Sequence, residues 1–176
     1  MKFKSALMGI LIVSLSMVGN TQAEPRKTFK PGDQTIAEIA TSTSGFSTLV
    51  AALVCTDLVG AVSDPYAELT VFAPTDAAFG KNGLNAGNIC STFDEATLTT
   101  ILLYHVVGER RPSPSVVRGK NKSIAMLDGG YIYPEGKGSL NIEDNLGRTI
   151  PIATADILAS NGIIHVVGDV LLPFSP

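Results

Sequence analysis

The amino-acid sequence predicts an α+β fold, in which a largely helical N-terminal half packs against a C-terminal half of mostly antiparallel strands. Between residues 35 and 103, apolar residues recur at the three- and four-residue spacing of amphipathic helices. From Gly108 onward, short β-branched and aromatic runs alternate with turns rich in Gly and Asn. Near the end, residues 163–167 form a dense apolar run typical of a strand buried on both faces. We expect the other elements to pack on this central strand.

The first 23 residues have the features of a cleavable export signal. Two lysines precede an apolar stretch, residues 6–18, that is too short to span a bilayer, and small residues follow where a signal peptidase reads. We therefore expect residues 1–23 to be removed. Residues 24–34 are polar and contain two prolines, so they are predicted to form a flexible leader. The domain is expected to span residues 35–174, without a membrane-spanning segment.

Helical spacing is clearest in the N-terminal half of the domain. The predicted helices span residues 35–40, 46–55, 58–62 and 95–103. The β-branched and aromatic content of residues 69–73 indicates a strand. Thr75 can then cap a short helix over residues 76–79, because its hydroxyl can accept a hydrogen bond from the first turn. Residues 81–88, which are rich in Gly and Asn, are expected to form a loop.

The C-terminal half is expected to consist of strands and turns. The predicted strands span residues 123–127, 131–133, 140–142 and 149–153. The last apolar segment follows a Ser-Asn-Gly turn signal at residues 160–162. Gly and Asp interrupt it, and residues 170–172 are expected to resume the strand pairing. His165 is the polar side chain inside the buried run, so it must find a hydrogen-bond partner there.

Composition and motifs narrow the function classes. The formal net charge of −3, without interleaved basic and aromatic residues, argues against nucleic acid as the main partner. The GxSxG, HExxH and phosphate-loop motifs are absent from the sequence, so we do not expect an enzyme.

The sequence contains two cysteines, Cys55 and Cys90. In an exported chain such a pair indicates one structural disulfide. A reactive thiol pair or a metal site is the alternative, but the spacing is not CxxC and no His is nearby. We expect the disulfide to tie the helical layer together.

Three segments resemble, in sequence, order and separation, those of the fasciclin domain family. They are TVFAPTDAAF at residues 70–79, LLYHVV at 102–107 and ASNGIIHVVGDVLLP at 159–173. The resemblance covers about residues 35–174. It implies a wedge-shaped β-sandwich with an N-terminal helical layer, and exported, non-enzymatic adhesion or binding proteins. The structural signature residues that it implies are Asp76, Tyr104, His105, Asn161 and His165.

The signature residues also allow a chemical interpretation. Asp76 can accept backbone N–H groups in the first turn of a helix, or act as a general base or ligand. His105 and His165 can be hydrogen-bonded core residues, or metal ligands if the strands bring them together. No third ligand is signalled, so no metal and no cofactor is expected. The rival hypothesis is a cell-envelope small-ligand-binding protein or enzyme that uses His105 or His165 with Asp76 in a pocket.

Two groups of residues are candidates for partner binding. In animal adhesion members of the family, positions that match Tyr104, His105, Asp156 and Ile157 are implicated in integrin binding, although Ile157 also suits a core or strand-entry position. A local excess of positive charge can hold an anionic polysaccharide or a phosphate-bearing surface, or can be a solvated loop. Its residues are Arg110, Arg111, Arg118, Lys120 and Lys122.

Taken together, these features predict an exported adhesion or binding module, secreted or periplasmic. Its expected partner is a protein or polysaccharide of a matrix or cell surface. Weak self-association through an apolar patch is a further alternative.

Overall fold

The computed structural model describes residues 32–117, 123–136 and 139–174. In this part of the chain, none of the helices has the length and the apolar character needed to cross a membrane.

Several predictions fall wholly or partly outside the described residues. The predicted export signal, residues 1–23, lies outside them. Three residues of the predicted basic loop do so as well: Arg118, Lys120 and Lys122. Of the predicted leader, residues 32–34 are described. The carbonyl oxygen of Gln34 accepts a hydrogen bond from the backbone N–H of Ser160 at 2.8 Å, so the end of the leader is tied to the domain.

The helices predicted in the N-terminal half are all present in the structure, within a residue or two of the expected bounds. The structure has α1 (Ile36–Ser42), α2 (Ser47–Cys55), α3 (Val59–Ser63), α4 (Asp76–Gly80), α5 (Ile89–Thr92), α6 (Glu95–Leu103) and α7 (Ser113–Val117). Thr35 caps α1 in a capping box with Glu38. Thr75 caps α4 and Asp94 caps α6, each through its side-chain oxygen. The short helices α5 and α7 were not predicted.

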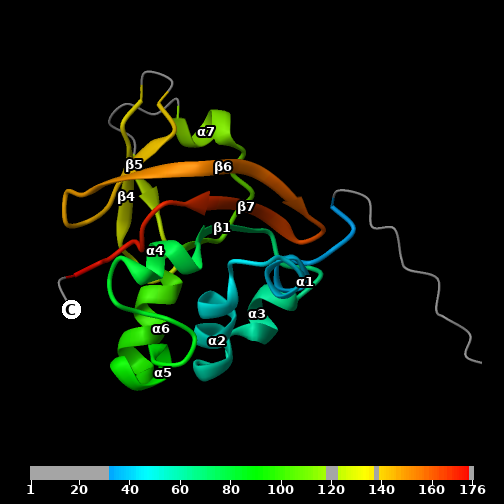
Figure 1. Cartoon of the computed structure of the whole chain (residues 1–176). Helices are drawn as coiled ribbons and strands as arrows, with labels where there is room; N and C mark the ends of the chain where they lie inside the picture. The colour runs from blue at the N-terminus through cyan, green and yellow to red at the C-terminus, as the bar shows by residue number, and fades with distance from the viewer. Residues whose placement is uncertain (1–31, 118–122, 137–138, 175–176) are drawn as a thin grey trace, which may run out of the picture.

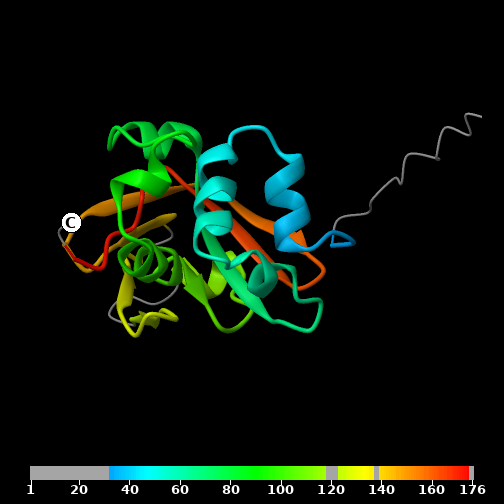
Figure 2. The same ribbon diagram turned by 90° about the horizontal axis from the view of Figure 1, so that it is seen from below.

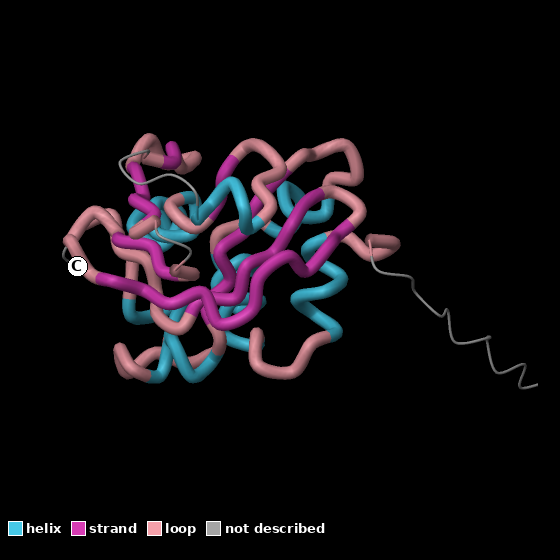
Figure 3. Tube along the Cα trace, turned by 90° about the horizontal axis from the view of Figure 1, so that it is seen from above, coloured by secondary structure: helices cyan, strands magenta, loops and turns pink. Residues whose placement is uncertain are grey.

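Seven strands form one sheet. They are β1 (Leu69–Pro74), β2 (Val106–Val107), β3 (Ile124–Ala125), β4 (Tyr131–Pro134), β5 (Asn141–Glu143), β6 (Thr149–Ala159) and β7 (Gly162–Val167). Their order in the sheet is β2-β1-β7-β6-β5-β4-β3. Neighbouring strands are antiparallel except for β1 and β7, which are parallel with Leu69 opposite Gly162. The strands run as a band along the molecule (Figure 3), and the predicted α+β class is confirmed.

The strand β7 is buried along its whole length, as its apolar run predicts. Helices α1–α6 lie on one side of the central strands and α7 on the other (Figures 1 and 2). Side chains of β1 alternate between two apolar clusters: Val71 and Ala73 pack with the helical layer, whereas Phe72 packs with β3–β5 and α7. Likewise, Ile164 joins the first cluster and Val167 the second. The central strands therefore separate two cores.

Residues 170–172 do not resume the strand, contrary to the prediction. Side chains take the backbone groups that a neighbouring strand would otherwise bind. Arg148 donates to the carbonyl oxygen of Val170 at 2.8 Å, and the backbone N–H of Leu171 donates to Nε2 of His105 at 3.0 Å. The N–H of Leu172 donates to Asp144 at 3.3 Å.

The strand predicted at residues 149–153 is longer than expected, because β6 continues to Ala159. Its pairing with β7 shifts register twice, between Ile152 and Thr154 and again between Thr154 and Ile157. Such bulges break the alternation of buried and exposed residues on which the prediction depends.

Candidate functional site

Asp76 connects the first turn of its own helix, α4, to the start of α2. Its Oδ1 accepts the backbone N–H of Thr48 at 2.7 Å, and its Oδ2 accepts the N–H and hydroxyl of Ser47 at 3.2 and 2.8 Å. Partial burial opposes ionisation, but these hydrogen bonds outweigh it, so the pKa of Asp76 is lower than usual. The carboxylate therefore acts as a helix cap for α2.

Tyr104 joins three parts of the chain from the interior. Its hydroxyl donates to the carbonyl oxygen of Tyr131 and accepts the backbone N–H of Asn145, both at 2.7 Å. The side chain is fully buried, and burial raises its pKa. Tyr104 thus fastens β4 and the β5–β6 turn to the end of α6.

His105 is the next residue and is also buried. Its Nδ1 lies 2.7 Å from the carbonyl oxygen of Ile101, and its Nε2 accepts the N–H of Leu171 at 3.0 Å. The second contact leaves Nε2 without a proton, so Nδ1 carries it and donates to Ile101. Burial lowers the pKa of His105 to about 4. The ring is therefore neutral near pH 7 and holds the C-terminal segment against α6.

His165 and Asn161, in the last signature segment, also bind backbone groups of distant parts of the chain. His165 Nε2 lies 2.8 Å from the carbonyl oxygen of Arg111, and its Nδ1 accepts the N–H of Asp156 at 3.2 Å. Burial lowers the pKa of His165. The side chain of Asn161 accepts the N–H of Ile36 at 2.9 Å. It also donates to two carbonyl oxygens at the end of α3.

The structure does not bring Asp76, His105 and His165 together as the rival hypothesis requires. Their hydrogen bonds go to separate partners, mostly backbone groups. Within the described residues, every buried side-chain nitrogen and oxygen has a hydrogen-bond partner. The same part of the chain holds no group of three or more His, Cys, Asp or Glu side chains placed to share a metal ion.

The four residues compared with integrin-binding positions lie in different environments. Tyr104 and His105 are 0% and 2% exposed, so their side chains cannot meet a partner in this conformation. Ile157 is half-buried and packs against the helical core. Asp156 is exposed, but its carboxylate accepts the backbone N–H of Ser113 at 2.7 Å and the Ser113 hydroxyl, which caps α7.

The two described arginines of the basic loop are held by the fold. Arg110 donates to the carbonyl oxygen of Ser160 at 2.5 Å and to those of Ala159 and Gly162 at 3.4 Å. It therefore fastens the β6–β7 turn. Arg111 forms an ion pair with Glu109, with Nη2 and Oε1 2.5 Å apart.

We call the following group of exposed and half-buried residues the β6 surface: Arg110, Arg111, Ser113, Asp156 and Leu158. Buried His165 binds the backbone of both Arg111 and Asp156 and so keeps these two residues close together. Leu158, which is 49% exposed, supplies the apolar part of this surface.

Sequence reasoning missed an ion pair between a buried carboxylate and a partly exposed arginine. Asp144 is 1% exposed, and its Oδ2 lies 2.6 Å from Nη2 of Arg148. Asp144 also accepts the N–H groups of Leu146 and Arg148, each at 3.0 Å, which closes the β5–β6 turn. The Asp-Asn-Leu-Gly-Arg order signals only the turn; the burial follows from the C-terminal segment that covers it.

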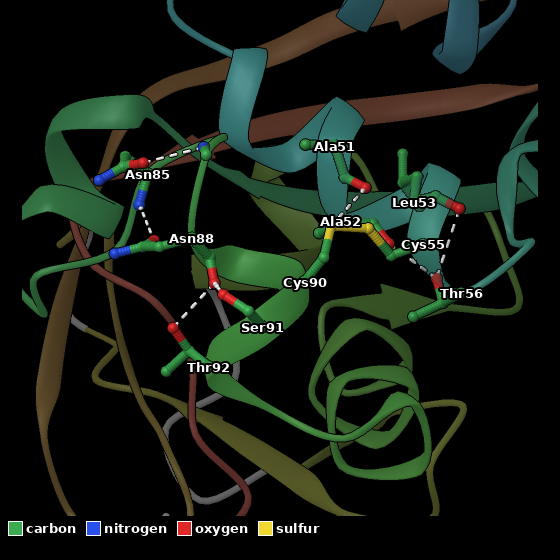
Figure 4. The surroundings of a disulfide bond; sticks show 11 residues. Ala51, Ala52, Leu53, Cys55, Thr56, Asn85, Asn88, Cys90, Ser91 and Thr92 are labelled. Atoms are coloured by element: carbon green, nitrogen blue, oxygen red, sulfur yellow. Dashed lines mark hydrogen bonds between the residues drawn. A yellow bond between two sulfur atoms is a disulfide. The ribbon is translucent and has the colours of Figure 1, made fainter.

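Cys55 and Cys90 form the predicted disulfide, with their Cα atoms 6.0 Å apart. It joins the last residue of α2 to the second residue of α5 (Figure 4). The helical layer thus has a covalent link between two of its helices.

Comparison with known proteins agrees with this geometry. Residues 44–173 match the Fasciclin domain family. Protein sll1483 from Synechocystis is 38% identical over 142 residues, covering 79% of this chain and 73% of that protein. Uncharacterized protein sll1735 from the same organism is 37% identical over 138 residues, covering 78% of this chain and 96% of that protein.

A solved structure shares the fold. It is a FAS1 domain pair from the insect cell adhesion molecule Fasciclin I, similar with a TM-score of 0.70 at 18% sequence identity. The match covers 80% of this chain and 51% of the solved one, so this chain corresponds to about half of the pair.

Proposed function

The chain belongs to the fasciclin domain family, and on that premise we propose that it is an exported adhesion or binding module without catalytic activity. Its partner is a protein or polysaccharide of a matrix or cell surface. Family members are generally extracellular or secreted adhesion or binding proteins. In this proposal, residues 1–23 are removed on export to the periplasm or medium, residues 24–34 are a leader, and residues 35–174 are the binding domain.

One observation carries the proposal: the polar signature side chains are used inside the fold. Asp76 caps α2, Tyr104 and His105 fasten the C-terminal half to α6, and Asn161 and His165 fasten the β6–β7 hairpin. Their hydrogen-bonding groups already have partners, so they favour a rigid frame over a reacting centre. Binding by such a frame depends on the shape and charge of its exposed surface.

The β6 surface is the region that we propose for the contact. It combines an exposed apolar side chain, Leu158, with the charges of Arg110, Arg111 and Asp156. Arg110 donates to backbone carbonyl groups, Arg111 pairs with Glu109, and Asp156 accepts from Ser113. These contacts fix the positions of the charged groups, so little side-chain entropy is lost when a partner binds. Tyr104 and His105 contribute by supporting this frame.

The test uses the chain without residues 1–23, immobilised and exposed to a glycan array and to a set of purified matrix proteins. We expect binding by the wild type and loss of binding by Leu158→Asp, which places a charge in the apolar part of the β6 surface. Tyr66→Asp is the matched control, because Tyr66 is 91% exposed in the segment between α3 and β1. Binding that is equal in wild type and Leu158→Asp would exclude the β6 surface.

A second variant separates the two kinds of partner. Arg118, Lys120 and Lys122 are changed together to Gln, while Arg110 stays because it fastens the β6–β7 turn. Loss of binding to anionic glycans alone identifies this loop as a polysaccharide contact. Unchanged binding assigns the contact to the β6 surface. If the wild type binds neither glycans nor matrix proteins, the proposed function is wrong.

A further inference from the structure

A cavity of about 300 Å³ lies within the helical layer. It is enclosed by α4, α5, α6, the loop before α5 and residues 170–172. Its walls are mainly apolar, and the side chains that line it include Phe79, Leu84, Ile89, Phe93, Leu98 and Leu172. A second cavity, between α1, α2 and the central strands, has a volume of only about 30 Å³ and is an ordinary packing void.

The polar groups that line the larger cavity are already bonded to the protein. Asn82 donates to Asp169 at 3.2 Å, and the hydroxyl of Thr92 donates to the carbonyl oxygen of Asn88 at 2.9 Å. Both ring nitrogens of His105 are used, and the ring is neutral near pH 7. A water molecule needs two to four polar partners to occupy a buried site, and these walls offer few.

The volume of the cavity decides what it can hold. An engineered apolar cavity of about 150 Å³ stays dry and binds benzene. The present cavity is about twice as large. An unfilled void of this size forfeits the van der Waals contacts of its lining, so a filled state is favoured whenever a fitting apolar molecule is present.

We infer that this cavity is a binding site for a small uncharged apolar molecule, of the size of a two-ring aromatic compound or a medium-length alkyl chain. No lining residue carries a charge near pH 7, so a ligand carboxylate or ammonium would lose its hydration without gaining an ion pair. Asn82 and Thr92 are exposed as well as lining the cavity, which places its opening beside them.

The wall formed by α5 is held in place by a disulfide at its second residue and by hydrogen bonds of the residue before it. The disulfide joins Cys90 of α5 to α2 (Figure 4). The side chain of Asn88 binds the backbone of Asn85 at 2.7 Å and of Gly83 at 2.9 Å, which fixes the loop before α5. A site with a fixed wall loses little conformational entropy on binding.

The test is a titration of the isotope-labelled protein with naphthalene, followed by methyl NMR. We expect saturable shifts confined to the methyl groups that line the cavity, such as those of Leu84, Ile89, Leu98 and Leu172, and a higher melting temperature in the presence of naphthalene. The charged analogue 2-naphthoate is expected to cause neither change. Shifts that are absent, or that spread over the whole protein, would overturn the inference.

Two variants make the result specific. Leu84→Trp fills the cavity and is expected to abolish the naphthalene shifts, whereas Val54→Trp is the control because Val54 is 64% exposed on α2. If Leu84→Trp does not fold, Leu98→Phe replaces it, with folding checked by circular dichroism. Naphthalene shifts that persist in a folded, filled variant would contradict the inference. The NMR shifts do not depend on adhesion, so this test can support or contradict the cavity inference whatever the outcome for the proposed function.

Discussion

The buried imidazole of His165 accepts a hydrogen bond from the backbone N–H of Asp156 at 3.2 Å, at a residue whose φ is 60°. Residues other than glycine seldom adopt this left-handed conformation, although Asp tolerates it better than most. Here the conformation turns the N–H of Asp156 toward the ring and the carboxylate toward Ser113. His165 therefore fixes a bulge of β6 from the inside, and Asp156 transmits that order to α7.

The two histidines carry their protons on opposite nitrogens. His165 has an unprotonated Nδ1 and donates from Nε2 to Arg111, whereas His105 donates from Nδ1 to Ile101 and keeps Nε2 unprotonated. A second proton on either ring would face a backbone N–H that already points at it. Protonation of either histidine therefore opposes folding.

Stability is expected to fall as the pH drops below 6.5. The folded-state pKa of His105, about 4, is below its unfolded value of 6.5, so the unfolded chain binds more protons between these values. The contribution of neutral His105 to the free energy of unfolding is fully present above pH 6.5 and is lost progressively as the pH falls toward 4. From pH 7 to pH 5 we expect a loss of about 2 kcal/mol from His105. His165 adds to it in the same direction. Urea unfolding at a series of pH values measures the free energy of unfolding at each pH.

The control is His105→Gln, whose amide has no titration in this range. It should lower the stability at pH 7 but make the dependence on pH shallower than in the wild type. The sequence contains no other histidine besides His165, and the pKa values of Asp76 and Asp156 lie below their usual range. An equally steep loss in His105→Gln would contradict the assignment.

Asn161→Ala is expected to destabilise the domain by about 2–5 kcal/mol, because it removes two buried hydrogen bonds and a partly buried one and leaves their backbone partners unpaired. Asn85→Ala is the matched control. Asn85 is exposed and its side chain accepts only a local N–H from Gly87, so its loss should cost about 1 kcal/mol or less. Denaturant unfolding at pH 7 compares the two, and similar values would show that Asn161 is not the link described here.

Gly162→Ala is expected to cost at least about 3 kcal/mol or to prevent folding. A Cβ atom at this position would lie 2.3 Å from the carbonyl oxygen of Leu69, which belongs to the neighbouring strand and cannot move without disturbing the pairing of β1 and β7. Gly60→Ala in α3 has open space around it and should be neutral or stabilise by up to about 1 kcal/mol. Thermal unfolding of both variants gives the comparison. A Gly162→Ala protein as stable as wild type would refute the close approach.

Replacing Cys55 and Cys90 together by Ser is expected to lower the free energy of unfolding by about 4 kcal/mol, from the chain entropy of a loop of this length. Because the bond holds α5, hydrogen exchange should speed up first in α5 and the loop before it. Wild-type protein treated with a reductant is the matched comparison. Unchanged exchange in α5 would show that packing alone holds this helix.

Local signals in the sequence predicted the local features well. Thr75 caps α4 as predicted, because a cap needs only a hydroxyl and the next three residues. The dense apolar run around His165 predicted a buried strand and a histidine that needs partners, and both are present. The predicted α+β class follows from the same kind of evidence.

Features that depend on distant residues were not predictable in this way. The helix α7 has Pro112 before it and Pro114 in its first turn, and its start is capped by Asp156 from a distant strand. Residues 170–172 are apolar enough for a strand, but Asp144, Arg148 and His105 bind their backbone groups first. The positive charge at residues 110 and 111 is visible in the sequence, but the contacts of Arg110 with Ser160 and of Arg111 with Glu109 are not.

The parallel pairing of Leu69 with Gly162 sets the order in which the protein can assemble during synthesis. The ribosome releases the segments of α1–α6 long before it makes β7, so the early helices have no completed sheet to cover. Contacts between such distant positions also slow folding, since a long stretch of chain must close before they form. The central strands consequently cannot close, and the early helices cannot cover a completed sheet, until β7 has been made.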